Sequence, residues 1–314
     1  MKLLELVDAY VAFKRSLGMR FTTQPRVFRR FSRILGDIDV RDVTPQGVRA
    51  FLDGDGALTN TWFLNYGLLR ELFSFAVSRG FTNRSPLPVF KPSPLPPFRP
   101  HIYTTAELSA LLSATSVLKS VRNPLQPLTF RALLIILYGT GMRVGEALRL
   151  SLRDTDLHSR VLTVRDTKFY KSRLVPLGPR LTDELAAFRK RRAALPMPQL
   201  DDSAFFASST GRALPYQHVI TLFQRVRKDA GIQRDEGSSY PPRLHDLRHT
   251  AAVHRVVAWY RDGADVQRLL PQLATYLGHK DLRSTQHYLT MTPELLERAS
   301  LRFLHYANPG GRHA

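Results

Sequence analysis

Apolar residues recur at helical spacing through the first part of the chain. The first run predicts a helix that buries Leu4, Val7 and Val11, with Leu3 and Tyr10 beside them. A second run predicts a helix whose apolar face is formed by Val27, Phe28, Phe31, Ile34 and Leu35. Both runs place their apolar side chains on one face, as expected for helices that pack together around a core.

Two further helices are predicted before the first strong break. Thr44 followed by Pro45 has the form of a helix start, because threonine caps well and proline fits the first helical position. Another helix is predicted over residues 60–79, ending at Gly80. Residues 1–84 are therefore predicted to form a helical domain.

A proline-rich stretch follows this region. Residues 85–100 contain seven prolines. Proline fixes φ and disrupts both helices and central strands, so residues 85–101 are predicted to be an extended linker between two domains. The alternative is a proline-rich docking motif for a partner protein.

The remainder, residues 102–314, is predicted to be a second and mainly helical domain. Thr104 and Glu107 have the spacing of a capping box at a helix start. An apolar helix from Leu128 to Leu137 is predicted to end near Gly139 and Gly141. The chain from Leu181 onward is also predicted to be mainly helical.

One segment of this second domain has the pattern of a β-hairpin. In RVLTVRDT, residues Val161 and Thr163 are expected on one face, and Leu162 and Val164 on the other. A turn is expected around FYKS, and Leu174, Val175 and Leu177 follow in a second strand. The predicted fold class is mainly α, with a small β-hairpin or sheet.

The charge of the chain points to a polyanionic partner. Its net charge is +20, and arginine outnumbers lysine 37 to 9. Residues 1–100 carry 15 basic against 8 acidic residues, and residues 101–314 carry 31 against 18, so both parts are basic. Arginine pairs with phosphate through a fork of donors, so the expected polyanion is one that carries phosphates, as double-stranded DNA does. The alternative is that the charge serves only solubility.

Composition also excludes several classes of site. The chain has no cysteine, which excludes disulfides and thiolate metal sites. No HExxH motif or comparable ligand cluster occurs, so neither a metal nor another cofactor is expected. No apolar run approaches the ~20 residues of a membrane span, and the N-terminus does not have the pattern of a signal peptide. A cytoplasmic location is therefore expected, with no membrane partner.

Six residues in four short motifs have the chemistry to bind and attack a phosphate. The motifs are TGMRVGEAL, TKFYKSRLVPL, HDLRHT and LGHKDLRSTQHYL. The six residues are Arg143, Lys168, His245, Arg248, His279 and Tyr288. Each alone is weak evidence, because an arginine is often a solvated charge and a tyrosine in a helix usually serves packing.

The positions of Arg143, His245 and Arg248 suit residues that bind a phosphate or exchange protons. Arg143 follows a glycine-flanked turn at a helix start, where anions bind readily. His245 and Arg248 are three residues apart, so they share one face of a helix or turn. An imidazole can accept a proton, and a guanidinium can neutralise a phosphate oxygen. His249 is expected on another face, with a structural role.

The phenol and the lysine complete the set. Tyr288 lies nine residues after His279, so a turn and a short helix can bring the two together. A phenol has a pKa near 10, so it needs nearby positive charge to attack at neutral pH. Lys168 precedes the hairpin turn and can lose its proton when desolvated, unlike arginine. Lys171 lies across the same turn, and spacing does not separate the two lysines.

In this order, the motifs resemble the tyrosine recombinase (phage integrase) family, over about residues 102–290. The resemblance implies a helical core-binding domain and a catalytic domain that close around DNA as a clamp. It implies that Arg143 and Arg248 bind the scissile phosphate, while His245 assists proton transfer and His279 hydrogen-bonds the phosphate. Lys168 would protonate the leaving oxygen, and Tyr288 would form a 3′-phosphotyrosyl intermediate. Glu146 matches an acidic position that orients its neighbours.

The resemblance further implies strand exchange through a Holliday junction, within a homotetramer on two DNA sites. Sister recombinases or DNA-bending proteins are compatible additional partners. DNA integration, transposition and resolution of chromosome dimers or plasmids all fit this chemistry. Two rival interpretations are a type IB topoisomerase, which relaxes DNA with the same active-site chemistry, and a non-catalytic DNA-binding protein of the same fold.

The sequence after Tyr288 predicts one more helix, over about residues 292–306. Thr292 can cap it, with Pro293 at the first helical position. An apolar stripe follows at helical spacing, formed by Leu295, Leu296, Ala299, Phe303 and Tyr306. The helix either packs on its own domain or, as the family resemblance implies, docks into a neighbouring protomer.

Overall fold

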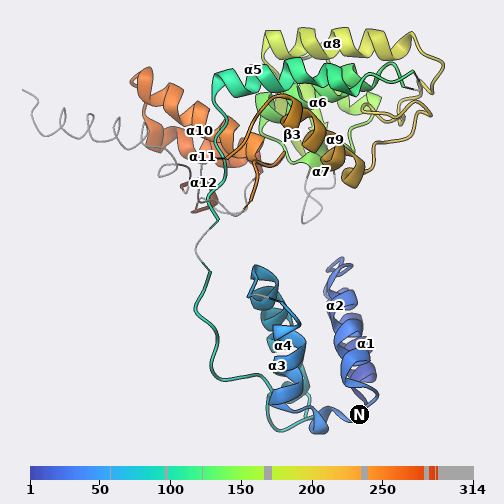
Figure 1. Cartoon of the computed structure of the whole chain (residues 1–314), viewed down its shortest axis with the longest axis vertical. Coiled ribbons are helices and arrows are strands. Elements are labelled where there is room, and N and C mark those ends of the chain that lie inside the picture. The colour runs from blue at the N-terminus through green and yellow to red at the C-terminus, as the bar shows by residue number, and fades with distance from the viewer. Residues whose placement is uncertain are drawn as a thin grey trace, which may run out of the picture. The chain divides into compact units, whose positions relative to one another are not determined.

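A computed structural model describes most of the chain (Figure 1). The described residues are 1–56, 58–95, 98–121, 123–165, 172–234, 240–278, 283–286 and 288, and they form two compact units, Met1–Phe98 and a second unit from Arg99 onward. None of the described helices is both long enough and apolar enough to cross a lipid bilayer. Each unit is built around its own apolar core.

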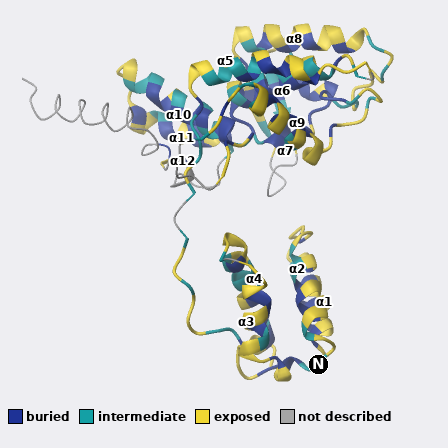
Figure 2. Ribbon diagram, in the orientation of Figure 1, coloured by how far each residue is buried: buried dark blue, intermediate teal, exposed yellow. Residues whose placement is uncertain are grey.

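The first unit is helical, as the sequence pattern predicts. Its helices are α1 (Leu3–Ser16), α2 (Gln24–Leu35), α3 (Pro45–Asp53) and α4 (Asn60–Ser78), with a 3₁₀ turn η1 (Val40–Asp42). Buried and exposed residues alternate along each helix (Figure 2), and the buried ones form a single core. The core is rich in aromatic residues, and Phe28, Phe31 and Phe73 are fully buried.

The prediction that Leu4 and Ile34 belong to the core is wrong. Leu4 is 47% exposed and Ile34 is 56% exposed, whereas Leu6 and Ser32 are buried. In both helices the apolar pattern is broad enough to allow more than one rotation about the helix axis. The buried face is selected by the neighbouring helices, which the pattern within one helix does not contain.

The ends of the later helices agree with the predicted signals. The Thr44 hydroxyl accepts a hydrogen bond from the amide of Gly47 at 3.1 Å, which caps α3. Helix α4 ends just before Gly80, whose φ of 71° is in the left-handed region. These signals act locally, which is why the sequence alone is sufficient to place them.

The described part of the proline-rich stretch contains neither helix nor strand, and its beginning lies on the first unit. The Tyr66 hydroxyl of α4 donates a hydrogen bond to the Pro88 carbonyl at 3.3 Å. The ammonium of Lys91 lies 4.7 Å from the centroid of the same Tyr66 ring. These contacts hold the beginning of the stretch against α4.

The second unit is mainly helical and is organised around a buried central helix. Its helices are α5 (Thr105–Ala114), α6 (Gln126–Thr140), α7 (Val144–Ala147), α8 (Pro179–Ala193), α9 (Tyr216–Asp229), α10 (Asp246–Arg261), α11 (Val266–Leu277) and α12 (Arg283–Gln286), with 3₁₀ turns η2 (Thr115–Leu118) and η3 (Leu152–Asp154). Helix α6 packs against α8 and α10. The predicted capping box is present, because the hydroxyl of Thr104 accepts from the amide of Glu107 at 3.1 Å.

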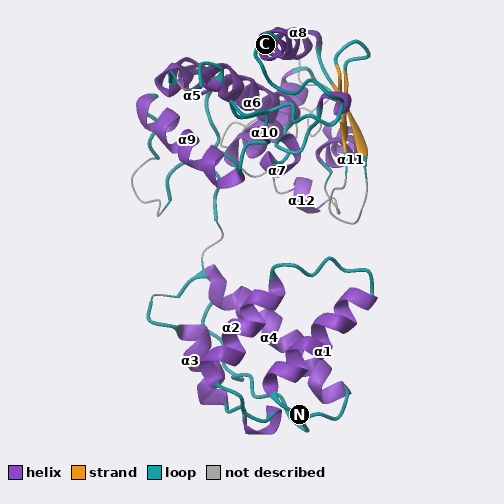
Figure 3. Cartoon of the chain, turned by 90° about the vertical axis from the view of Figure 1, so that its right-hand side faces the viewer, coloured by secondary structure: helices purple, strands orange, loops and turns teal. Residues whose placement is uncertain are grey.

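A three-stranded antiparallel sheet lies at one side of this unit, beside α11 (Figure 3). Its strands are β1 (Thr155–Asp156), β2 (Val161–Val164) and β3 (Arg173–Pro176). The predicted faces of β2 are confirmed, because Leu162 and Val164 are buried. The two-residue strand β1 is too short to produce an alternating pattern. Residues 169–171 of the turn expected around FYKS lie outside the described residues.

Two glycine turns bring the ends of α6 and α11 together. Gly141 caps α6 with a φ of 62°, and Gly278 caps α11 with a φ of 70°. A Cβ on Gly141 would lie only 2.6 Å from the Leu277 Cδ2 atom. The close approach therefore requires glycine at position 141, and the candidate site is built on these two turns.

Candidate active site

Arg143 lies at the start of α7, immediately after the Gly141 turn. Its Nη1 donates to Glu146 Oε1 at 2.9 Å, and its backbone amide donates to Glu146 Oε2 at 3.1 Å. Its Nη2 donates to the carbonyl of Gly278 at 3.2 Å. The side chain is still 41% exposed, so this cation is held in place while remaining accessible.

Arg248 lies in the first turn of α10 and is almost entirely buried. Its Nη1 donates to the carbonyl of Gly141 at 2.7 Å, and its Nη2 donates to the carbonyl of Leu277 at 2.9 Å. Burial, followed by the nearby charge of Arg143, lowers the pKa of Arg248 to about 10. The guanidinium therefore remains charged at neutral pH and links the turns that end α6 and α11.

Glu146 is a buried carboxylate shared by two arginines. It is 4% exposed, and besides Arg143 it accepts two hydrogen bonds from Arg173 of β3, at 2.7 and 3.3 Å. Burial acts to raise the pKa of Glu146, but the hydrogen bonds and charge of Arg173, together with those of Arg143, hold it at about 2. Glu146 is therefore ionised and orients both cations, which agrees with the expectation for this position.

His245 and Tyr288 lie beside the buried arginine. Burial, then the charges of Arg248 and Arg243, lower the pKa of His245, so its imidazole is neutral at pH 7 and can accept a proton. Tyr288 is 2% exposed, and burial raises its pKa. The charge and a hydrogen bond of Arg248, and the charge of Arg143, oppose that rise. The structure thus brings together Arg143, His245, Arg248 and Tyr288.

His249 does not lie away from this group, as its place next to Arg248 in the sequence led us to expect. Its ring contacts the ring of Tyr288 and also the ring of His245, in tilted, edge-type arrangements. Tyr288 belongs to the same apolar cluster as Ala252, Val253 and Val256 of α10, so the phenol packs near this helix. Sequence spacing missed this contact because Tyr288 comes from a different element.

Three other candidates lie outside the described residues: Lys168, Lys171 and His279. Their described neighbours belong to the site. Arg173 begins the strand that follows the two lysines, and Gly278, which directly precedes His279, accepts the hydrogen bond from Arg143. The sequence did not single out Arg173. Its contact with Glu146 joins two separate motifs, and nothing in either motif indicates that they meet.

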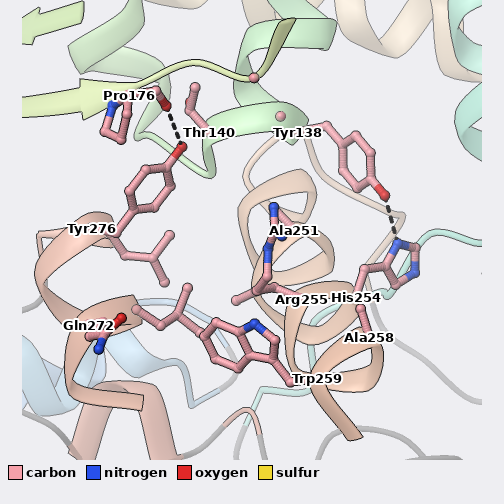
Figure 4. A pocket seen from close by; sticks show the side chains of 15 residues that line it. Tyr138, Thr140, Pro176, Ala251, His254, Arg255, Ala258, Trp259, Gln272 and Tyr276 are labelled. Atoms are coloured by element: carbon pink, nitrogen blue, oxygen red, sulfur yellow. Dashed lines mark hydrogen bonds between the residues drawn. The ribbon is translucent and has the colours of Figure 1, made fainter. Parts of the chain in front are cut away.

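A cavity of about 570 Å³ lies next to the site, between α6, β3, α10 and α11 (Figure 4). Within it, the hydroxyl of Tyr276 donates to the Pro176 carbonyl at 3.4 Å, and the hydroxyl of Tyr138 is 2.9 Å from His254 Nδ1. Neither Arg143 nor Arg248 lines this cavity. Tyr276, the other tyrosine near the end of α11, therefore points to β3 and not to the arginines, which leaves Tyr288 as the better nucleophile candidate.

Comparisons with known proteins agree on the kind of molecule. The sequence model of the phage integrase family matches residues 104–294. The chain is 38% identical over 303 residues to y4rE of Sinorhizobium fredii, assigned as an integrase/recombinase, covering 95% of this chain and 94% of that protein.

Solved structures of lambda integrase share the fold. A dimer bound to a COC′ core site matches with a TM-score of 0.68 and 21% identity, covering 90% of this chain and 97% of that one. A tetramer bound to a Holliday junction matches with a TM-score of 0.69 and 20% identity, covering 92% and 77%.

Proposed function

The chain belongs to the phage integrase family, and on that premise we propose that it cleaves and rejoins DNA strands through a covalent bond to Tyr288. The activity is site-specific DNA recombination of the tyrosine type. The observation that carries the assignment to these residues is the convergence of the Tyr288 phenol with the guanidinium groups of Arg248 and Arg143. A binding protein needs the two cations but has no use for a phenol beside them.

The proposed cleavage step exchanges one phosphodiester for another. The Tyr288 oxygen forms a bond to phosphorus, and the bond from phosphorus to the 5′ oxygen breaks. The phenolic proton passes to His245, which is neutral, and Lys168 gives a proton to the departing oxygen. Attack by a 5′-hydroxyl on the 3′-phosphotyrosine reverses the step. The bond energy is conserved, so religation requires no nucleotide.

Arg143 and Arg248 supply the charge that this step requires. A guanidinium has five N–H donors. Among the described contacts, Arg143 donates to Glu146 and to the Gly278 carbonyl. Arg248 donates to two backbone carbonyls and to the Tyr288 phenol. The remaining donors can bind the oxygens of the scissile phosphate, because the anchoring contacts hold both groups in place before DNA binds. His279, directly after the Gly278 turn, would add a further hydrogen bond.

The first unit is proposed to bind the same DNA. Its helix α2 carries exposed arginines at positions 26, 29, 30 and 33. In this proposal residues 1–84 form the core-binding domain, residues 85–101 the linker, and residues 102–314 the catalytic domain. The basic surplus of both parts supports a clamp around the duplex. A DNA substrate would place the enzyme in the cytoplasm with the chromosome.

The proposed assembly is a homotetramer on two DNA sites, with strand exchange through a Holliday junction. The fold shared with the lambda integrase tetramer bound to a Holliday junction supports it. The helix predicted over about residues 292–306, which lie outside the described residues, would dock into a neighbouring protomer. Deletion of residues 292–314 should then preserve binding to one site and abolish the joining of two. Recombination by the truncated chain would show that the segment packs only on its own domain.

The decisive experiment tests the covalent bond. Wild-type chain and Tyr288→Phe are incubated with DNA flanking the encoding gene, in excess EDTA and without nucleotide, and SDS-resistant adducts are captured and mapped. We expect adducts at a defined site with wild type alone, and equal DNA binding by both. An adduct formed by Tyr288→Phe contradicts the assignment, and dependence of cleavage on Mg²⁺ indicates a nuclease. Supercoil relaxation without joining of two sites indicates a topoisomerase.

A further inference from the structure

We propose that Arg173 is a positioning residue that offsets the charge of Glu146 and so leaves the charge of Arg143 available to the scissile phosphate. The inference rests on the proposed function, in which Arg143 binds that phosphate. Arg173 belongs to strand β3 of the hairpin and is not among the six residues that the motifs single out.

The geometry divides one carboxylate between two arginines that differ in exposure. Arg143 Nη1 lies 2.9 Å from Glu146 Oε1, and Arg173 Nη2 lies 2.7 Å from Glu146 Oε2. The Arg173 side chain is 14% exposed and the Arg143 side chain is 41% exposed. Arg173 is therefore the inner partner of Glu146, and Arg143 is the partner that can also reach a ligand from solvent.

The net charge of the group formed by Glu146 and its arginines depends on Arg173. Glu146 with Arg143 alone is a neutral pair, whereas Glu146 with both arginines has a net charge of +1. Burial strengthens electrostatic interactions, so a neutral pair and a singly positive group attract a phosphate very differently. Because Arg173 makes the shortest ion pair to Glu146, the surplus positive charge is left at Arg143, the accessible end.

Arg173 also contacts the turn that anchors Arg143. A Cβ on Gly278 would lie 2.9 Å from Arg173 Nη1 and 3.0 Å from its Cζ, so the guanidinium packs directly on this glycine. The Gly278 carbonyl accepts the hydrogen bond from Arg143. Arg173 thus supports Arg143 twice, through Glu146 and through the backbone that directly precedes His279.

One donor of Arg173 is left without a partner among the described residues when its two Nη atoms donate to Glu146. Its Nε is buried and finds no acceptor within the part of the chain that the structure describes. A buried donor without a partner lowers stability. The guanidinium instead faces Glu146 and Gly278, which is the placement that a role in the site requires.

The experiment uses the full chain and a nicked duplex that carries the mapped cleavage site. The rate of adduct formation is measured in a single turnover, and DNA binding is measured separately, for wild type, Arg173→Gln, Arg173→Lys, Glu146→Gln and the double variant Arg173→Gln/Glu146→Gln. Arg165→Gln is the matched control. Arg165 directly follows β2 of the same hairpin, and it pairs with the buried Asp154 of η3 instead of Glu146. Thermal melting checks that each variant is folded.

We expect Arg173→Gln to slow cleavage by about tenfold to hundredfold, less than the loss of a direct phosphate donor, with DNA binding unchanged. The double variant should cleave faster than Arg173→Gln, because removing the Glu146 charge releases Arg143 again. Arg173→Lys should lie between Arg173→Gln and wild type, since it keeps the charge and loses the fork. Arg165→Gln should cleave like wild type.

Three results overturn the proposal. Wild-type cleavage by Arg173→Gln shows that Arg143 does not depend on it. A double variant as slow as, or slower than, Arg173→Gln shows that the Glu146 charge is not the cause. If Arg173→Gln is unfolded, Arg173→Met replaces it in the same comparison, because it also removes the charge. Absence of any adduct with wild type overturns the proposed function, and this inference with it.

Discussion

The imidazole ring of His249 lies against the phenol ring of Tyr288, with centroids 5.7 Å apart and planes inclined by 62°. The same imidazole lies 5.3 Å from the ring of His245. Burial, followed by the charge of His245, lowers the pKa of His249 to about 4, so the ring is neutral at pH 7. His249 Nδ1 is buried without an acceptor or donor among the described residues, so the contact with Tyr288 is one of packing.

Substitution of His249 should therefore act through the shape of the ring. His249→Ala leaves a gap beside the phenol and should slow adduct formation by about tenfold to hundredfold, because small misplacements of a reacting group are costly. His249→Phe keeps a ring and should remain much closer to wild type. Single-turnover cleavage of the nicked duplex measures both. Equal rates for His249→Ala and wild type would remove any role for the contact, and a defect confined to His249→Phe would point to the ring nitrogens.

The carboxylate of Glu146 should make stability depend on acid pH. Its pKa is about 2 in the folded chain against 4.5 for the ordinary group, so the folded state favours the ionised form. The resulting stabilisation is complete above pH 4.5 and is lost as pH falls toward 2, with an upper limit of roughly 3 kcal/mol, since one pKa unit corresponds to about 1.4 kcal/mol. Denaturant unfolding of wild type and Glu146→Gln measures it. Their difference should shrink across this window, and a constant difference would contradict the assignment.

Gly141 should tolerate no side chain. Its φ of 62° is unfavourable for alanine, and the added Cβ would lie 2.6 Å from Leu277 Cδ2. Gly141→Ala should lower the free energy of unfolding by about 2–4 kcal/mol, from backbone strain and overpacking together. Gly145→Ala is the matched control, because its Cβ would meet nothing closer than 3.5 Å and its helical conformation suits alanine. Urea denaturation should find the control unchanged or stabilised by up to about 1 kcal/mol.

The exposed arginines of α2 should determine part of the salt dependence of DNA binding. Arg26, Arg30 and Arg33 are exposed on this helix. Replacing all three by glutamine should reduce the slope of log affinity against log salt by about 0.9 for each phosphate that the variant no longer neutralises, measured by anisotropy between about 50 and 200 mM salt. Arg49→Gln is the comparison, because the charge of Arg49 is already offset by Asp53 at 3.3 Å. An unchanged slope in the triple variant would place the DNA on another face of the first unit.

The sequence predicts best those features that are determined over a few residues. The Thr104–Glu107 capping box, the Gly141 turn and the alternation of Leu162 and Val164 all depend on adjacent positions. Leu4 and Ile34 were wrong because the rotation of a helix about its axis depends on its neighbours. The contacts of Arg173 and His249 were missed for a related reason, because each joins elements that are distant in the sequence. Arg173 reaches Glu146 across 27 residues, and His249 meets Tyr288 only after α10 and α11 have packed.

The anchoring of the arginines to distant carbonyls has a consequence for the newly made chain. Synthesis proceeds from the N-terminus, so Arg143 leaves the ribosome well before Gly278, its acceptor 135 residues later. Arg248 likewise precedes its acceptor at Leu277 by 29 residues. While the chain is being made, Arg143 and Arg248 therefore lack the carbonyls of Gly278 and Leu277 that orient them, and Tyr288 is synthesised after both. In the proposed mechanism, the capacity to cleave DNA appears only after Tyr288 has left the ribosome.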